Sequence, residues 1–357
     1  MILKNESGKD YLDAVRDGSF VYGLKIDCDL DKYLRYKQGT FNVFAGHSNV
    51  GKTKFILYYY LCLAVKHQKK FLIFSTENTT GGLKRDLMQL HANKKVEDMN
   101  EVDYQYHFEF INEYFKFIDF ESFFVNNKRF MNFRDVFKTA HSIINDFDAL
   151  VIDPYNSLAT VEDIKGNGHE RDYAIAQEFR MFCKVNNKSI YLLAHGNTEA
   201  LRKRFASGHD FSGHPMPLMA SDIEGGGKWV NRSDDFVVIH RLTQHESEWM
   251  KTEIHVRKIK ETETGGTPSF MDTPIIFHLQ NNSLSFNCYT RITDYHIIPT
   301  SSVNPLLKKG QPQPKQAEMK MPIGKEFDIK KKEAINPNNR IEGKVQEWEE
   351  PDLDIWE

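Results

Sequence analysis

The stretch GHSNVGKT at residues 46 to 53 carries two glycines, a lysine and a threonine at the spacing of a phosphate-binding loop. It satisfies the pattern G-x-x-x-x-G-K-[ST], in which loop amides and the N-terminus of the next helix face the phosphates of a nucleotide. The apolar run FNVF precedes it, and the helix-like KFILYYYLCLAVK follows it. The sequence therefore predicts an ATP or GTP site built from Gly46, His47, Ser48, Asn49, Val50, Gly51, Lys52 and Thr53.

Two residues of this loop and one distant aspartate suit the chemistry of a metal-bound triphosphate. Lys52 should reach the β and γ phosphates, and the Thr53 hydroxyl should coordinate Mg²⁺. The apolar run DALVID ends in Asp153, whose carboxylate can hold a magnesium-bound water opposite Thr53. We therefore expect Mg²⁺ at Thr53 and Asp153, the alternative being an aspartate that only caps a loop.

A glutamate and a histidine follow two further apolar runs. Glu77 in FLIFSTEN should lie near the γ-phosphate, where it can polarise the attacking water as a general base. His195 in YLLAHGN can hydrogen-bond the γ-phosphate and report its loss. The plainer alternatives are a surface Glu77 that caps the next helix and a structural His195.

The elements that must position these residues read as strands alternating with helices. Apolar runs begin at residues 41, 71, 149, 190 and 236, and helical patterns separate them. One helix is expected over NFRDVFKTAHSIINDF, with Asn132 as its N-cap. The segments TEIHVRKIK, IIFHL and SLSFN alternate instead. We predict a doubly wound α/β fold, a mostly parallel sheet flanked by helices with an antiparallel C-terminal extension, and ligands at the carboxyl ends of its strands.

Composition and charge narrow the functional classes. The net charge of -3 gives no overall attraction to nucleic acid, so any DNA contact must come from local basic loops. The four cysteines have no CxxC spacing, which argues against a zinc site or a disulfide framework. No apolar stretch reaches the roughly 18 residues of a membrane span. We expect a protein of the cytoplasm that makes no contact with a membrane.

Taken in order, these motifs resemble the DnaB and Twinkle type of hexameric replicative helicase, which has a RecA-like fold. LDKYLRYKQGTFNVFAGHSNVGKT is similar to that family's entry into the phosphate loop, and IFSTEN followed by LKRDLM is similar to its second motif. VIDPYNSL and LLAHGN resemble its Walker B and sensor segments, and SDIEGGGKWVNRSDDFVVIHR resembles its channel loop and the strand behind it. The resemblance, over about residues 20 to 290, implies an ATP-hydrolysing motor that forms a hexameric ring, moves along single-stranded DNA and unwinds duplex DNA.

The family's arginine finger, which a neighbouring subunit supplies, is the main departure. It lies in a K-x-R stretch before a glycine turn, and VRKIKETETGG offers Lys258 and Lys260 at the matching positions, with Arg257 adjacent. A lysine lacks the planar fork that contacts phosphate in a bidentate way. Either Lys260 serves less stringently or Arg257 takes the role, and a plain basic surface strand is the alternative.

Two loops are expected to contact DNA because they leave the carboxyl edge of the sheet. One is ATVEDIKGNGHERDYA after Walker B, and the other runs from residue 200 to 228 after the sensor strand. In the second loop the basic side chains can follow phosphates, and the glycines allow close approach of backbone amides. The DNA-contacting residues expected there are Arg202, Lys203, Arg204, Gly225, Gly226, Gly227 and Lys228.

Three segments are expected along the chain. Residues 1–35 form an N-terminal linker or packing segment, 36–298 the ATPase domain, and 299–357 a disordered tail with an acidic, tryptophan-containing end. The resemblance favours that end as a site for a replication protein such as a polymerase or primase, the alternative being a solubilising tail. The abundance of Lys, Asn, Phe and Tyr, and the absence of accessory domains, suit a phage protein in its host's cytoplasm.

Two other functions share parts of this pattern. A RecA-like recombinase or a helicase-loader-type ATPase has the same core but forms a filament or acts on a partner. A nucleotide-dependent scaffold without catalysis would not need Glu77. Direction of translocation, ring or filament assembly, and base preference are not encoded in any of these motifs.

Overall fold

The computed structural model describes residues 8–20, 22–159, 164, 168–280, 282, 284–289 and 294–296. The chain divides into two compact units, Met1–Lys308 and Lys309–Glu357. All described residues belong to the first unit. The predicted tail 299–357 and its boundary at residue 298 lie outside the described residues.

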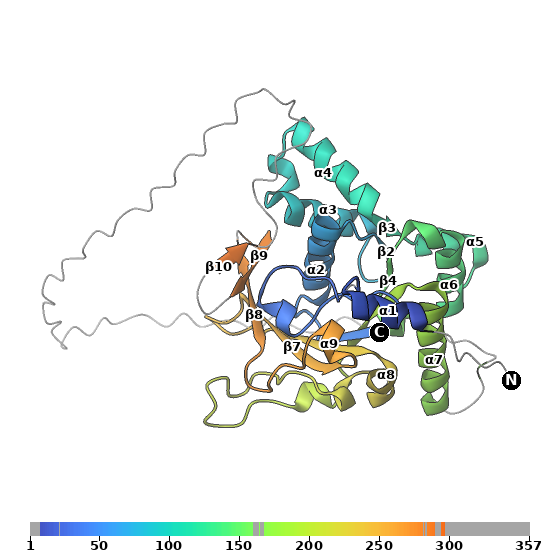
Figure 1. Cartoon of the computed structure of the whole chain (residues 1–357). Helices are drawn as coiled ribbons and strands as arrows, with labels where there is room; N and C mark the ends of the chain where they lie inside the picture. The colour runs from blue at the N-terminus through green and yellow to red at the C-terminus, as the bar shows by residue number, and fades with distance from the viewer. Residues whose placement is uncertain are drawn as a thin grey trace, which may run out of the picture. The chain divides into compact units, whose positions relative to one another are not determined.

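A single sheet forms the centre of the first unit. Within the described residues it has ten strands in the order β10-β9-β8-β7-β6-β1-β5-β4-β2-β3 (Figure 1). Their bounds are β1 Phe41–Gly46, β2 Phe71–Ser75, β3 Phe115–Phe117, β4 Ala149–Asp153, β5 Ser189–His195, β6 Asp235–His240, β7 Lys251–Ile259, β8 Ile275–Gln280, β9 Ser285–Tyr289 and β10 Asp294–His296.

The sheet has a parallel half and an antiparallel half. Neighbouring strands from β6 through β1, β5, β4 and β2 to β3 run parallel. The pairs from β6 to β10 run antiparallel. The predicted fold class and its C-terminal extension are thus confirmed. The three-residue strands β3 and β10 were not predicted, because they are too short to show a periodic pattern.

Helices cover both faces of the parallel half (Figure 1). The α-helices are α1 Lys9–Asp17, α2 Lys52–His67, α3 Thr80–Ala92, α4 Glu101–Tyr114, α5 Phe120–Asn127, α6 Phe133–Ser142, α7 Gly168–Asn186, α8 Gly227–Arg232 and α9 Thr262–Gly265. Short 3-10 turns are η1 Asp29–Lys32, η2 Val96–Asp98, η3 Ile144–Asp146, η4 Tyr155–Ser157, η5 Ala200–Arg202 and η6 Ala220–Asp222.

Alternate residues of each central strand enter two separate cores. On β1, Phe44 packs with α2 and α3, while Phe41, Val43 and Ala45 pack with α6, α7 and α8. Every residue of β1, β2 and β4 is buried. Burial on both faces is why these strands read as continuous apolar runs.

Helix α6 begins as predicted and ends earlier. The Asn132 side chain accepts hydrogen bonds from the Arg134 and Asp135 amides, which completes a capping box. The helix ends at Ser142 because Ile143 leaves the helical region, with φ -127° and ψ 33°. The last apolar residue of the predicted helical stretch nevertheless reaches the core, since Phe147 beyond the helix is buried.

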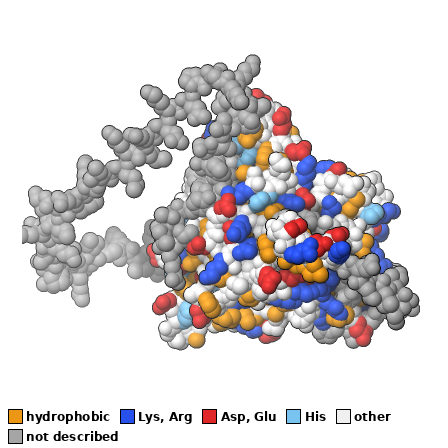
Figure 2. Space-filling view, in the orientation of Figure 1, with side chains coloured by type: hydrophobic (Ala, Val, Ile, Leu, Met, Phe, Trp, Pro, Cys, Tyr) orange, Lys and Arg blue, Asp and Glu red, His pale blue; other side chains and the backbone are white. Residues whose placement is uncertain are grey.

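The N-terminal segment has two parts. Helix α1 buries none of its residues, and the side chains of Tyr11 and Leu12 are 52% and 67% exposed. The following stretch belongs to the core, because Ile26, Leu30 and Leu34 are buried. On the face that carries α1, lysine and arginine side chains gather below this helix (Figure 2). In the part of the chain that the structure describes, every helix is too short or too polar to span a membrane.

Candidate nucleotide site at the carboxyl edge of the sheet

The phosphate loop links β1 to α2 and depends on two glycines. A Cβ on Gly46 would lie 2.4 Å from the Ile239 carbonyl oxygen, so no larger residue fits beside β6. Gly51 has φ 82° and precedes α2, a left-handed conformation that favours glycine. Ser48 and Asn49 are exposed, whereas His47, Val50 and Lys52 are buried. The loop therefore offers its backbone at the N-terminus of α2, as the motif predicts.

Lys52 lies at the centre of the loop. Its ammonium donates to the Gly46 carbonyl at 3.0 Å, to the His47 carbonyl at 2.9 Å and to His195 Nδ1 at 3.1 Å. Burial lowers its pKa to about 8, against the opposing effect of Asp153 and Glu77. A cation in so dry a site gains strongly from a phosphate partner.

His195 joins Lys52 to Glu77. Because the lysine donates to Nδ1, the neutral imidazole must carry its proton on Nε2, which donates to Glu77 Oε1 at 3.0 Å. The three side chains come from α2, the end of β5 and the segment after β2. The sequence placed each of them at a strand end or at the loop that follows one, and the fold brings them into one hydrogen-bonded chain.

Glu77 does not cap α3. The N-cap of that helix is Thr79, whose hydroxyl accepts a hydrogen bond from the Gly82 amide at 3.1 Å. The Glu77 side chain is 48% exposed and bends toward His195. A carboxylate that is open to water on one side and held on the other has the geometry of a group that activates water.

Thr53 and Asp153 face each other across α2 and β4. The Thr53 hydroxyl donates to Asp153 Oδ2 at 2.7 Å. Asp153 is 2% exposed, and its Oδ1 is buried without a hydrogen-bond partner among the described residues. Burial raises the pKa of Asp153 to about 6, which the Thr53 hydroxyl opposes and nearby Glu77 reinforces. An orphaned carboxylate oxygen beside a hydroxyl fits a hard divalent cation such as Mg²⁺.

The loop after β5 is hydrogen-bonded to the nucleotide site. His47 Nε2 donates to the Met216 carbonyl at 3.0 Å. The Glu224 amide donates to the His195 carbonyl at 2.9 Å, and the Asn197 amide donates to the Asp222 carbonyl at 2.7 Å. Hydrogen bonds therefore link this loop to both the phosphate loop and His195.

The basic residues predicted to contact DNA lie on that loop and hold local partners. Arg202 pairs with Glu199 at 2.9 Å, Lys203 pairs with Asp222, and Arg204 donates to the Gly213 carbonyl at 2.6 Å. Lys228 lies 3.7 Å from Asp172 on α7. The side chain of Arg202 is 73% exposed and that of Lys203 is 49% exposed, so both remain open to solvent.

The three predicted glycines surround the start of α8. Gly225 and Gly226 have φ 82° and 76°, and Gly227 is the first residue of the helix. A Cβ on Gly225 would lie 2.5 Å from Trp229 Nε1, so this glycine also serves packing. In the other predicted loop, after Walker B, residues 160–163 and 165–167 lie outside the described residues, and residues 168–174 belong to the start of α7.

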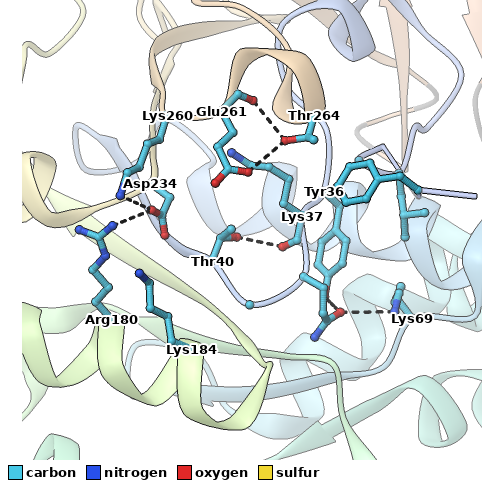
Figure 3. Close-up of a pocket in the computed structure, with 15 residues that line it drawn as sticks. Tyr36, Lys37, Thr40, Lys69, Arg180, Lys184, Asp234, Lys260, Glu261 and Thr264 are labelled. Carbon is cyan, nitrogen blue, oxygen red and sulfur yellow. Dashed lines mark hydrogen bonds and ion pairs between the residues drawn. The ribbon is translucent and has the colours of Figure 1, made fainter. Parts of the chain in front are cut away.

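Three side chains are candidate trans cations, meaning charges that a neighbouring subunit would supply in place of the arginine finger, and they have different surroundings. Arg257 lies 3.3 Å from His255 Nδ1 and contacts the Met271 sulfur at 2.7 Å. Lys258 donates to the carbonyls of Val230, Asn231 and Ser233 at 2.6, 3.3 and 2.7 Å. Lys260 is 42% exposed and lies 3.4 Å from Asp234 (Figure 3).

Sequence reasoning missed Arg241, the residue directly after β6. Its guanidinium lies about 3.5 Å from the position of a Cβ on Gly51, against the phosphate loop. Its Nε is buried without a hydrogen-bond partner among the described residues, and burial lowers its pKa. Its place after a predicted parallel strand was the available indication, since ligands gather at that edge.

Comparison with known proteins agrees with this geometry. The family model of the DnaB-like helicase C terminal domain matches residues 27–273. One solved structure, described as an ATPase domain, is similar with a TM-score of 0.61 at 12% identity, over 79% of this chain and 99% of that one. A structure described as a DnaB-like replicative helicase and its interactions with primase has a TM-score of 0.57 at 12% identity, over 80% of this chain and 67% of that one.

No curated protein matches the chain by sequence. At 12% identity the two solved structures show a shared fold, which is the RecA-like fold that the motifs predicted. The family model adds sequence support over more than half of the chain. The chain belongs to the family of DnaB-like helicase C-terminal domains.

Proposed function

We propose that this protein is an ATP-hydrolysing motor that moves along single-stranded DNA as a hexameric ring and unwinds duplex DNA during replication. The observation that carries the proposal is the hydrogen-bonded chain from Lys52 through His195 to Glu77 beside the phosphate loop. Family membership supports the helicase part of the proposal. The site chemistry supports the use of ATP, and the resemblance supports the ring and the movement along DNA.

The site residues divide the work of hydrolysis. Lys52 and the loop amides hold the β and γ phosphates, and Glu77 orients the attacking water and accepts its proton. Thr53 and Asp153 would hold Mg²⁺, which neutralises developing charge on the phosphates when bound. Arg241 lies where it can contact the nucleotide from the same subunit. The general base and the Mg²⁺ ligands are therefore different side chains, and Glu77 remains open to water.

His195 is the sensor in this proposal. When Lys52 turns from His195 toward a γ-phosphate, the imidazole loses the donor at Nδ1 and is free to reorient. The His195 carbonyl holds the Glu224 amide, so this change reaches the loop that carries Gly225. Loss of the γ-phosphate reverses the change. The loop would thus move once for each triphosphate that is cleaved.

Two surfaces complete the proposal. Arg202, Lys203, Arg204 and Lys228 follow the phosphates of single-stranded DNA by exchanging local carboxylates and carbonyls for phosphate oxygens. The acidic end of the chain, with Trp348 and Trp356, binds a replication protein such as a polymerase or primase. The similar helicase structure is described together with primase interactions, which motivates that choice.

The direct test is ATP turnover by wild type and Glu77→Gln, each with and without single-stranded DNA. We expect wild-type turnover to rise with DNA, and Glu77→Gln to lower kcat by about 10² to 10⁴-fold because the general base is lost. Binding of ATP should persist in the variant, since Glu77 does not contact the loop amides.

Unchanged turnover in Glu77→Gln would overturn the proposal. Imaging with a non-hydrolysable ATP analogue separates the ring from the recombinase-like alternative, which forms filaments. A strand-displacement assay then tests unwinding itself.

A further inference from the structure

A cavity of about 420 Å³ lies at the opposite edge of the sheet from the phosphate loop. Figure 3 shows Lys260, Arg180 and Lys184 on one side of it, with Asp234 between the first two. The rest of the wall is formed by Phe20, Gly23, Leu24, Tyr36, Lys37, Gln38, Gly39, Thr40, Lys69, Glu261 and Thr264. It is a mixed pocket in which cations outnumber the carboxylates.

Of the three candidate trans cations, only Lys260 has its charge available. Lys258 uses three donors on three carbonyls, which is the full capacity of an ammonium. Arg257 is half-buried against His255 and Met271, and burial lowers its pKa. Lys260 instead extends into the cavity, held by one ion pair of 3.4 Å.

Topology prevents Lys260 from acting on its own phosphate loop. Strand β7 runs antiparallel to β6, with Ile259 opposite Asp235 at the beginning of β6. Lys260 therefore lies at the edge of the sheet where the parallel strands begin. Gly46 begins the phosphate loop at the edge where they end. Six residues of strand separate the two edges, which is roughly 20 Å. A triphosphate that meets Lys260 must be bound to another copy of the chain.

Arg180 supplies the guanidinium that position 260 lacks. It projects from α7 toward the same carboxylate oxygen as Lys260, with 3.6 Å between Nη2 and Asp234 Oδ1. Its Nε is buried without a hydrogen-bond partner among the described residues. The other Asp234 oxygen accepts the Phe41 amide at 3.0 Å, so the aspartate is fixed at the start of β1. The Arg180 side chain is 18% exposed, and among the described residues the Asp234 carboxylate is the only charged partner found for its planar fork.

We propose that Arg180 and Lys260 together act in trans on the triphosphate held by the phosphate loop of the neighbouring subunit, with Arg180 providing the bidentate contact. The inference rests on the proposed function, because it needs subunits that share a site. The departure at Lys260 is compensated by an arginine from a different element, 80 residues earlier in the chain. Lys184, one helical turn along α7, adds positive charge to the same wall.

Steady-state kinetics test the guanidinium. Arg180→Ala should lower kcat at least about tenfold with little change in KM, because the contact forms only as charge develops on the phosphate. Arg180→Lys should recover only part of this loss, since lysine keeps the charge without the fork. Arg129→Ala is the matched control, because Arg129 also pairs with an aspartate, Asp135 on α6, but does not line the cavity.

Subunit mixing tests action in trans. Lys52→Ala lacks the phosphate contact, and the double variant Arg180→Ala with Lys260→Ala lacks the trans cations. If the cations serve the next subunit, mixing the two inactive proteins before assembly should restore activity, to roughly a quarter of wild type in equal mixtures, because one interface in four is then complete. Thermal melting of each variant shows that it is folded.

The outcomes are distinct from those that test the proposed function. Wild-type turnover that falls in Glu77→Gln but not in Arg180→Ala overturns the inference and leaves the motor intact. A kcat loss in Arg180→Ala without recovery on mixing also overturns it, because the residue then acts within its own subunit. Absence of any wild-type turnover overturns the proposed function first.

Discussion

Two buried carboxylates at opposite edges of the sheet have the same exposure and different partners. Asp153 ends β4 at the carboxyl edge, Asp235 begins β6 at the amino edge, and each is 2% exposed. Burial raises the pKa of both to about 6. Asp235 receives the Lys37 ammonium at 2.7 Å, whereas Asp153 receives a hydroxyl and keeps one oxygen without a partner among the described residues.

We infer that the difference separates a structural charge from one that serves the proposed function. Lys37 gives the Asp235 carboxylate a counter-charge within the chain, although burial still outweighs it in setting the pKa of Asp235. Among the described residues no cation lies at hydrogen-bond distance from Asp153, and a buried carboxylate without one is costly. In the proposed function, Mg²⁺ would supply this missing partner when the nucleotide binds. The comparison predicts that removing the partner of Asp235 lowers the free energy of unfolding and that neutralising Asp153 raises it.

The largest expected effect is on Lys37. Lys37→Met should lower the free energy of unfolding by about 3–5 kcal/mol, because it leaves Asp235 buried without its counter-charge. Chemical denaturation at pH 7.5 measures this. Lys66→Met is the control, since Lys66 pairs with the 63%-exposed Asp27 and its loss should cost no more than about 1 kcal/mol. Equal losses in both variants would contradict the distinction.

Asp153→Asn should change the free energy of unfolding in the opposite direction. At pH 7.5 without Mg²⁺ the variant should gain about 1–3 kcal/mol, because a neutral amide replaces a carboxylate that burial disfavours. The Thr53 hydroxyl can still donate to the amide oxygen. Added Mg²⁺ and ATP should stabilise wild type more than the variant, and ATP turnover should fall. A destabilised Asp153→Asn would show that the carboxylate is structural.

The pH dependence of stability tests the same two carboxylates in the wild-type protein, without a substitution. Both aspartates have a native pKa of about 6 against an ordinary value of 3.8, so between these values the native state binds more protons than the unfolded state. Their contribution to stability is therefore greatest in acid and declines as pH rises from about 4 to about 6. Asp153→Asn should remove its share of the decline. Denaturation curves at several pH values measure the slope.

The smallest effect concerns Thr79, two residues from Glu77. Thr79→Ala should cost about 1 kcal/mol of stability, because the N-cap of α3 is lost, while ATP turnover stays near wild type. Glu77→Gln should show the reverse, with lost turnover and unchanged melting. Melting curves and turnover measured on the same preparations separate capping from catalysis at this edge.

The sequence by itself determined the elements that carry the chemistry. The central strands are buried on both faces, so each reads as an uninterrupted apolar run, and Lys52, Glu77, Asp153 and His195 are placed by local order at or after strand ends. The N-cap at Asn132 was predictable for the same reason, because a cap depends on residues within one turn.

Only the tertiary structure decided how those residues are connected. The bond from Lys52 to His195 joins positions 143 residues apart, and Arg180 meets Lys260 through a shared aspartate from a third element. Helix α7 carries no local pattern that marks Arg180, and Arg241 is indicated only by its place after a predicted strand. The roles proposed for them depend on strand order and on the edge at which each element ends, which are set by packing across the whole sheet and not by neighbouring residues.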